Sequence, residues 1–386
     1  MSTATTFRRT LAHRLLVLLA LPASGAAGGC TSVGTSCPET EPQPTVACFA
    51  WPPEDAGAGG AGGGGAGGGG TGTADTCPSP ADAAQRLQQQ TLSFFEITEP
   101  GTLKDGQCCY QAMATPFCEG RPYLVDEVAR TAPPVRGHGD EGWSAAEHGA
   151  PRTDDLDAAQ RATLAAAWTR DALFEHASVA SFGRFALELL AVGAPADLVA
   201  DAHHAALDEV RHARLCFALA GAYAGEVVAP SAFPFEGRVE VVTDLASIAA
   251  RAVKEGCIGE TIAAIFAAER RDAAEDPAVR AALSHIAADE ARHAELAWRT
   301  VAWAIRAGGA RVRDAVEEAF AGLDRGAAPP PGAAPDARLA AHGLLGDEAL
   351  GGAARRAVAE VVRPAARLLL SAREDVRHVD GAMGAA

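Results

Sequence analysis

Apolar residues recur at helical spacing through the middle of the chain. From Asp154 to about Gly308 they lie three and four positions apart over long runs, as in amphipathic helices. Two turn signals interrupt these runs, Gly193-Ala194-Pro195 and Asp276-Pro277. In the second, an aspartate able to cap a helix precedes a proline at the first helical position. The pattern over residues 154–308 therefore predicts two long helical hairpins.

Residues 309–386 are expected to form a C-terminal helical extension. The proline-rich run 329–335 breaks the chain, and an amphipathic helix follows from about Gly352 to Arg373. Its apolar side is expected to pack on the preceding helices, with the arginines facing solvent.

Composition agrees with a helical protein. Only 5% of the residues are aromatic, while alanine and glycine abound, and sheets are usually richer in aromatic and β-branched residues. The formal charge of −16 repels phosphate backbones, so we expect no nucleic-acid partner. The sequence therefore predicts an all-α fold for most of the chain.

Residues 1–30 have the pattern of an export signal peptide. A basic start at Arg8 and Arg9 precedes the apolar run 15–21, and small residues lead to Cys30. This arrangement resembles a bacterial lipoprotein signal, although Ala27 stands where such signals usually have leucine. The resemblance implies a periplasmic or cell-envelope lipoprotein that is lipidated at Cys30 and meets the membrane only through that anchor. Without lipidation, the protein would be secreted.

Two segments separate this signal from the helices. Residues 31–76 contain several prolines and a Gly/Ala run, and are expected to be a flexible tether. Residues 77–150 are expected to be a small module of two or three short strands pinned by disulfides. In an exported protein, the even number of cysteines before the helices favours disulfides without assigning their pairing. These cysteines are Cys37, Cys48, Cys77, Cys108, Cys109 and Cys118.

A short motif, Asp-Glu-x-Arg-His, occurs once in each hairpin. Residues 208–212 and 289–293 both carry it. Three residues along an α-helix turn about 300°, so the glutamate and histidine of each copy lie on one stripe, one turn apart. A carboxylate and an imidazole placed in this way can share one metal ion.

Each motif has a glutamate that matches it on the preceding helix, Glu175 for the first copy and Glu260 for the second. In an antiparallel hairpin, residues at equal depth are equidistant from the turn. The midpoints fall near residues 193 and 276, where the two turn signals stand. Both hairpins therefore bend where a shared site in a bundle core requires it.

The link between the hairpins is long enough to run back along the helices. It extends from about Ala224 to Thr243 and spans up to ~63 Å when extended, against roughly 42 Å for the preceding helix. The second and third helices can then lie parallel, and the hairpins pair head to tail. Cys216 and Cys257 would then lie on opposite sides of the site, too far apart for a disulfide.

Over about 155 residues, this organisation resembles the ferritin-like superfamily of di-iron and di-manganese carboxylate proteins, which are four-helix bundles with a long crossover. The motif is most similar to that of bacterial multicomponent monooxygenases and related di-iron oxidases. The resemblance implies that Glu209 and Glu290 bridge two metal ions, two Fe or alternatively Mn. The implied ligands are Glu175, Glu209, His212, Glu260, Glu290 and His293.

The resemblance also implies supporting residues around the ligands. Asp208 and Asp289 would contact the imidazole N–H groups, and Arg211 and Arg292 would pair with those aspartates. The spacing leaves open whether each aspartate reaches the histidine on its own helix or the facing one, and the family favours the facing one.

The implied activity is that of a di-iron oxidase or oxygenase acting on O2 or peroxide with an unidentified electron donor. Small residues beside Glu260, Gly256 among them, are expected to leave room for O2. Ala263 stands where rubrerythrins carry a further glutamate, which disfavours their peroxidase role. The alternative is a protein that binds or sequesters iron or manganese without turnover; manganese catalase is a more distant one. The sequence identifies no substrate and no oligomeric state.

Overall fold

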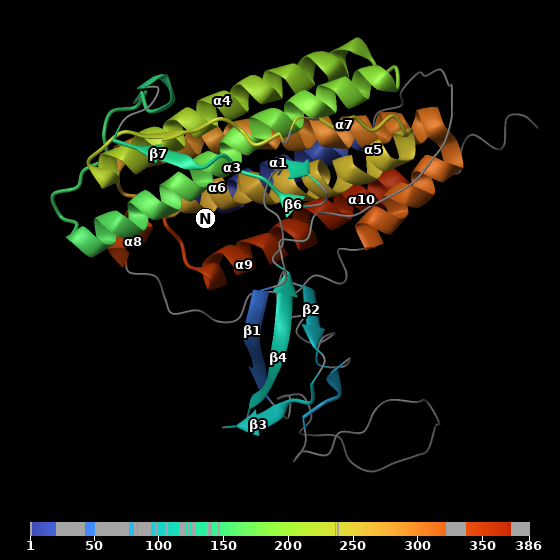
Figure 1. The fold of residues 1–386 in the computed structure, drawn as a ribbon. Helices are drawn as coiled ribbons and strands as arrows, with labels where there is room; N and C mark the ends of the chain where they lie inside the picture. Colours follow the sequence, from blue (N-terminus) through green and yellow to red (C-terminus); the bar gives the residue numbers. More distant parts are fainter. Residues whose placement is uncertain are drawn as a thin grey trace, which may run out of the picture. The chain divides into compact units, whose positions relative to one another are not determined.

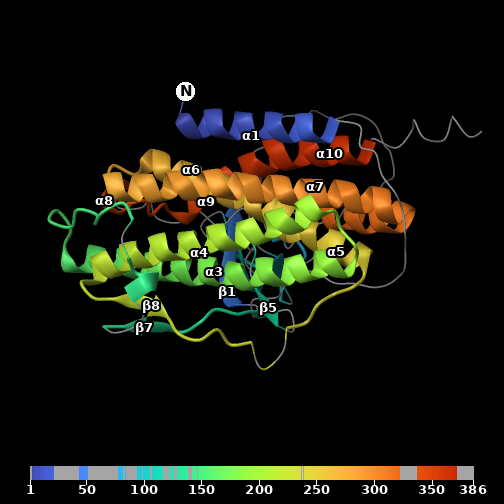
Figure 2. The same cartoon turned by 90° about the horizontal axis from the view of Figure 1, so that it is seen from above.

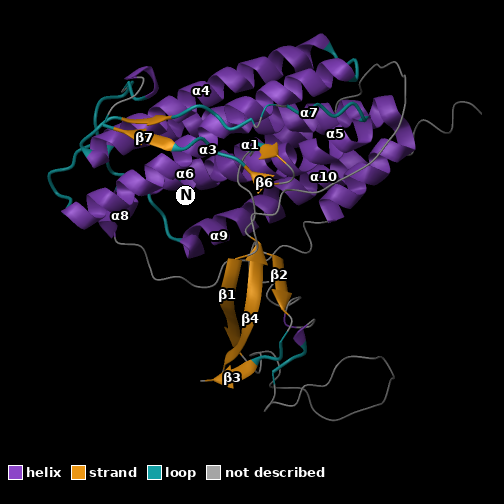
Figure 3. Cartoon of the chain, in the orientation of Figure 1, coloured by secondary structure: helices purple, strands orange, loops and turns teal. Residues whose placement is uncertain are grey.

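The computed structural model describes residues 2–20, 43–50, 77–80, 83, 94–97, 99–104, 107–115, 121, 123–125, 128–137, 141–145, 147–235, 237, 239–321 and 337–371. Most of this chain is helical, as the pattern predicts (Figure 3). The chain divides into two compact units. The helical unit comprises Met1–Pro38, Cys118–Ala321 and Ala334–Ala386, and the smaller unit comprises Glu39–Phe117 and Gly322–Ala333.

The first hairpin consists of α3 (Ala158–Ala191) and α4 (Ala196–Ala224), which pack along each other (Figure 1). Asp157 begins α3 with a capping box. The Asp157 side chain accepts a hydrogen bond from the backbone amide of Gln160, and the Gln160 side chain accepts one from the backbone amide of Asp157. The hairpin turns at Gly193, whose φ of 68° is the left-handed conformation that favours glycine after a helix. The turn therefore lies where the sequence predicts it.

The second hairpin is built from a helix in three parts and one long helix. Its first arm comprises α5 (Leu245–Arg251), the π-helical segment η3 (Ala252–Glu260) and α6 (Thr261–Ala273). Its second arm, α7 (Pro277–Ala321), packs against all three parts and against α4. Asp276 caps α7 by accepting from the amides of Ala278 and Val279. A non-helical residue, Gly309, bends α7 near the predicted end of the bundle.

The link between the hairpins follows the helices instead of crossing directly. Figure 2 shows it running along the bundle from β8 (Val228–Pro230) to the start of α5. Strand β8 pairs antiparallel with β7 (Pro134–Arg136), which precedes α3. The short 3-10 helix η2 (Glu141–Trp143) contacts α4 and β8. These contacts join the segment before α3 to the link.

Helices from both ends of the chain pack on the second hairpin. The C-terminal helices are α8 (Ala337–Ala341), α9 (Asp347–Ala357), η5 (Val358–Val362, π-helical) and α10 (Arg363–Ser371). Helix α1 (Thr3–Ala20) lies against α6, α7, η5 and α10. The predicted C-terminal helix therefore packs on the bundle as expected, although its helical region begins earlier, at Asp347.

Helix α1 is a packed part of the helical unit, which the signal-peptide interpretation does not anticipate. Leu11 and Leu15 are buried, and the Arg8 side chain is paired with Glu269 and Glu360. Cys30 and the cleavage region lie outside the described residues. No helix among the described residues combines the length and apolar character needed to span a bilayer.

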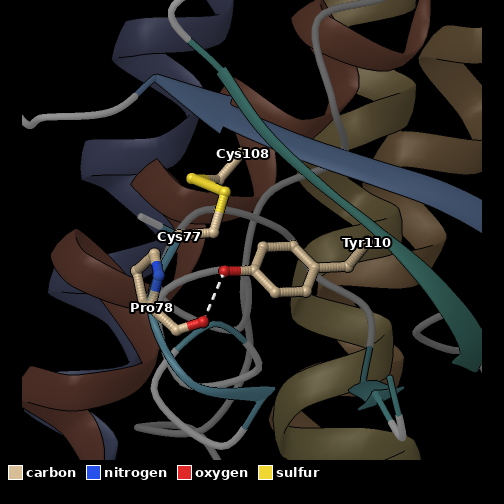
Figure 4. The surroundings of a disulfide bond; sticks show 4 residues. All are labelled: Cys77, Pro78, Cys108 and Tyr110. Atoms are coloured by element: carbon tan, nitrogen blue, oxygen red, sulfur yellow. Dashed lines mark hydrogen bonds between the residues drawn. A yellow bond between two sulfur atoms is a disulfide. The ribbon is translucent and has the colours of Figure 1, made fainter. Parts of the chain in front are cut away.

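Within the described residues, the smaller unit contains a four-stranded antiparallel sheet. Its central strand β4 (Gln107–Thr115) pairs on one side with β1 (Gln43–Ala50) and on the other with β2 (Phe94–Ile97) and β3 (Thr102–Lys104). Cys77 is disulfide-bonded to Cys108, and the Tyr110 hydroxyl donates to the carbonyl of Pro78 at 2.8 Å (Figure 4).

The observed division differs from the predicted one at two places. Residues 43–50 form strand β1 although the sequence places them in a flexible tether; the rest of 31–76 lies outside the described residues. The segment after Phe117, including the hairpin β5 (Leu124–Val125) and β6 (Val128–Ala129), belongs to the helical unit. In both cases, contacts with other parts of the chain determine to which unit the segment belongs.

Candidate metal centre

All six side chains singled out as metal ligands converge between the two hairpins. Helix α3 supplies one glutamate, η3 supplies another at its last residue, and α4 and α7 each supply a glutamate and a histidine three residues apart. They form two overlapping groups whose potential ligand atoms lie within 4.8 Å of one another. The groups are Glu175, Glu209, His212 and Glu290, and Glu209, Glu260, Glu290 and His293.

Glu209 and Glu290 belong to both groups, and each of them has one carboxylate oxygen near each histidine. Glu209 Oε2 lies 3.5 Å from the Nδ1 of His212, and its Oε1 lies 3.1 Å from the Nδ1 of His293. Glu290 Oε1 lies 3.2 Å from the Nδ1 of His212, and Glu290 Oε2 lies 3.5 Å from the Nδ1 of His293. Each carboxylate therefore offers one oxygen to each half of the centre.

The donor atoms fit a pair of cations. Both histidines are buried, and neither Nδ1 has a partner in hydrogen-bonding geometry despite the nearby carboxylates. Glu209 Oε2, Glu260 Oε1 and Glu290 Oε2 are also buried without such a partner. Four carboxylates and two neutral imidazoles carry a charge of −4, which two divalent cations balance, and buried charge is otherwise unfavourable. The residues therefore fit a dinuclear metal centre.

The second nitrogen of each imidazole faces an aspartate of the opposite helix. His212 Nε2 lies 3.2 Å from Asp289 Oδ2, and His293 Nε2 lies 3.3 Å from Asp208 Oδ2. Because an ionised carboxylate accepts a proton in a hydrogen bond, these contacts favour the neutral tautomer that has its N–H at Nε2, in which the Nδ1 lone pair faces the glutamates. Of the two arrangements that the spacing allows, the structure has the facing one.

One arginine binds both aspartates. Arg292 donates from Nη1 to Asp289 Oδ1 at 2.6 Å and from Nη2 to Asp208 Oδ2 at 2.9 Å. The other motif arginine, Arg211, is paired instead with Glu147, in the segment before α3. The expected pairing of each arginine with an aspartate therefore holds for Arg292, while Arg211 is turned toward a partner outside the bundle helices.

The surrounding carboxylates favour the protonated forms of both histidines in the metal-free centre. Burial alone lowers the pKa of His212, but the carboxylates around it, Asp289 first among them, raise that pKa well above its ordinary value. The same balance, with Asp208 as the first carboxylate, raises the pKa of His293. Metal ions must therefore displace protons from this centre.

The four glutamates divide into two pairs with opposite pKa shifts. Burial raises the pKa of Glu175 and of Glu260 well above the usual range, and the charge of Glu290 adds to the effect on Glu260. Burial also raises the pKa values of Glu209 and Glu290, but the two histidines outweigh it and lower both. The lowered pKa values thus belong to the two glutamates shared between the groups, and the raised ones to the glutamates at the two ends.

The two ends of the centre differ in exposure. The Glu175 side chain is 19% exposed, whereas that of Glu260 is 1% exposed. Glu175 therefore lies at the solvent edge, while Glu260 is enclosed.

Two charged residues near the enclosed end were not anticipated. Arg121, from the segment before β5, lies with Nε 3.5 Å from Glu260 Oε1 and donates from Nη1 to Glu255 Oε2 at 3.5 Å. No periodic pattern surrounds Arg121 in the sequence. Glu255 lies five residues before Glu260, about 140° away on an ideal α-helix, but η3 has the wider π-helical turn.

The space beside Gly256 is filled, contrary to the expectation that it leaves room for O2. A Cβ at this position would lie 2.2 Å from the Cβ of Ala297 and 2.9 Å from Arg121 Nη2. The glycine is needed because α7 and the arginine approach the helix closely.

The two cysteines of the bundle are free and buried. Burial raises the pKa of the Cys216 and Cys257 thiols well above the usual value. Their separate, unbonded state agrees with the expected head-to-tail pairing of the hairpins, and both behave as core residues.

Comparison with known proteins finds no family model that matches this chain, and no similar curated protein or solved structure.

Proposed function

We propose that this protein is a ferritin-like dinuclear metal protein, and that its two metal ions are iron used for the oxidation of a substrate by O2 or peroxide. The observation that carries the proposal is the division of Glu209 and Glu290 oxygens between two unpartnered imidazole Nδ1 atoms. A single ion does not account for this arrangement, because each histidine faces its own end of the cluster.

Each protein group has a distinct role in this proposal. Two ferrous ions bound here would supply two electrons to an oxidant. Glu175, Glu209, His212, Glu260, Glu290 and His293 would hold them. Asp208 and Asp289 would keep the imidazole protons at Nε2, so that the Nδ1 lone pairs would be available as ligands. Arg292 fixes both aspartates.

The two ends of the centre differ in their access to solvent. The Glu175 side chain is partly exposed, whereas that of Glu260 is enclosed. In this proposal, O2 or peroxide reaches the centre at its Glu175 end.

The test combines metal analysis with oxygen consumption. We expect the protein, loaded anaerobically with Fe(II) and desalted, to retain two ions per chain and to consume O2 faster than the same concentration of free Fe(II). The Glu209→Ala variant should lose both properties, and His203→Ala, an exposed change on α4, should keep them. Two ions with no faster O2 consumption would replace the oxidase by the alternative, an iron- or manganese-binding protein. Fewer than two ions would overturn the site.

Export remains part of the proposal. A protein processed at Cys30 would be a cell-envelope lipoprotein without α1, and a protein that keeps α1 would carry the helix packed as observed.

A further inference from the structure

A buried arginine reaches the candidate metal centre from outside the four long helices. Arg121 precedes β5, and its side chain is only 1% exposed. Its carbonyl accepts a hydrogen bond from the Ser178 hydroxyl of α3 at 3.1 Å. Both its main chain and its side chain are thus held in the bundle.

Aromatic rings and carboxylates hold the guanidinium group. Its carbon lies 4.6 Å and 4.3 Å from the ring centroids of Phe182 and Phe185, a cation–π arrangement. Phe182 also packs edge-on against the ring of His293, with centroids 5.0 Å apart. Arg121 is therefore fixed by the same aromatic side chain that packs against a candidate ligand.

The arginine has hydrogen-bond donors to spare. Its Nε and Nη2 atoms are buried without a hydrogen-bond partner, and Glu260 Oε1, which faces its Nε at 3.5 Å, is likewise unpartnered. The missing side chain of Gly256 is what lets Nη2 approach η3. Two buried donor atoms of this guanidinium and the facing oxygen of Glu260 would be costly to leave without partners unless they act on each other.

The other end of the centre has a different neighbourhood. Glu175 lies 3.6 Å from His212 Nδ1 and is partly exposed to solvent, which screens charge. At the Glu260 end, the positive charge of Arg121 is shielded from solvent, and the carboxylate that pairs with it, Glu255, is shared with a second arginine, Arg184. A cation in a site of low dielectric repels a second cation strongly.

We propose that Arg121 is a positioning residue for Glu260 and makes the two metal positions unequal. It holds one oxygen of Glu260, and its charge weakens binding of the ion at the Glu260 and His293 position. The ion at the Glu175 and His212 position binds more tightly and first. This inference rests on the proposed dinuclear site.

The experiment titrates the metal-free full-length protein with Co(II), followed by visible absorbance and calorimetry. The wild type should bind two ions in two separate steps. Glu260→Gln should remove the weaker step, and Glu175→Gln the tighter one. These two variants assign the steps without any change to Arg121. Removal of the tighter step by Glu260→Gln would overturn the inference.

Substitution of the arginine tests its charge directly. In Arg121→Met, the weaker step should tighten by about tenfold or more, because the fixed charge beside the second ion is gone, and the Co(II) spectrum of that step should change. Arg121→Lys, which keeps the charge, should preserve the separation of the steps. The control is Arg313→Met, which removes a buried arginine of α7 that donates to the carbonyl of Leu370; it should lower stability and leave both steps in place.

The outcomes separate this inference from the proposed function. If the wild type binds no Co(II), the dinuclear site itself fails. If it binds two ions in one unresolved step, or if Arg121→Met leaves the steps unchanged, the site stands and the role of Arg121 is refuted. If Arg121→Met does not fold, the assignment by Glu260→Gln and Glu175→Gln still decides the order of binding.

Discussion

The imidazole rings of His212 and His293 lie with their centroids 5.8 Å apart and their planes inclined at 40°. Each ring turns Nδ1 toward the shared carboxylates and Nε2 toward an aspartate of the opposite helix. The two rings thus face one cluster from two sides, with the carboxylates of Glu209 and Glu290 between them.

The first prediction distinguishes shared ligands from end ligands. Glu209→Ala or Glu290→Ala should remove both metal ions, because each carboxylate has one oxygen at each histidine. Glu175→Ala or Glu260→Ala should remove only one. Elemental analysis of Mn(II)-loaded, desalted variants gives the number of ions per chain. Equal losses in all four variants would contradict the distinction between shared ligands and ligands of one ion.

The second prediction concerns the aspartate that faces His212. Asp289→Asn replaces an acceptor that fixes the imidazole proton at Nε2, and metal affinity should fall by about 10 to 100-fold. Competition with a chelator of known affinity measures the change. Asp314→Asn, an exposed change on the same helix, should leave the affinity unaltered. An unchanged affinity in Asp289→Asn would refute the role of the aspartate.

The third prediction follows from the pKa shifts of the metal-free centre. The raised pKa values of His212 and His293 stabilise the metal-free fold below about pH 6.5, the unfolded value, and this contribution is lost as pH rises through the folded values. The raised pKa values of Glu175 and Glu260 also stabilise the metal-free fold at low pH. Their contribution begins to be lost at a lower pH, because the unfolded pKa of a glutamate is lower than that of a histidine.

Bound metal replaces these protons, so the increase in Tm on adding Mn(II) should grow as pH rises from about 6 to about 8.5. Thermal unfolding with Mn(II) and with a chelator at each pH measures it. The double variant Glu209→Ala, Glu290→Ala is the control and should show no increase at any pH. An increase in Tm that shrinks with rising pH would contradict the proton competition.

The fourth prediction tests whether α1 stays with the protein. In a chain that keeps its N-terminus, Leu15→Ala should lower the free energy of unfolding by about 2 to 5 kcal/mol, because Leu15 is fully buried. Val17→Ala, at a position 48% exposed, should change it by less than about 0.5 kcal/mol. Mass spectrometry of protein expressed in a bacterium with a lipoprotein pathway provides the complementary measurement. A mature N-terminus at a lipidated Cys30 would establish processing and make Leu15→Ala silent.

The positions of the candidate ligands follow from local rules. Glu209 and His212 lie one helical turn apart whatever surrounds them, and the capped turns at Gly193 and Asp276 set the depth of every ligand in its hairpin. Helix periodicity and turn chemistry are therefore sufficient to predict from the sequence that six distant side chains converge.

The remaining features depend on contacts that no local pattern carries. Arg121 and Glu147 come from irregular segments, and only the packing of those segments on the bundle brings them near the motifs. Glu255 was missed because the π-helical turn departs from the period used to place residues on faces. Strand β1 pairs with a strand more than 50 residues away, so its own composition says little about it.

The two copies of the Asp-Glu-x-Arg-His motif differ in the contacts of their arginines. Arg292 ties together the carboxylates of both copies, and Arg211 is left to hold Glu147. Arg292 therefore acts as a common support, and damage to it would disturb both histidines at once. Damage to Arg211 would instead loosen the polypeptide that leads into α3, so the same arginine of the motif supports the histidines in one copy and anchors the chain in the other.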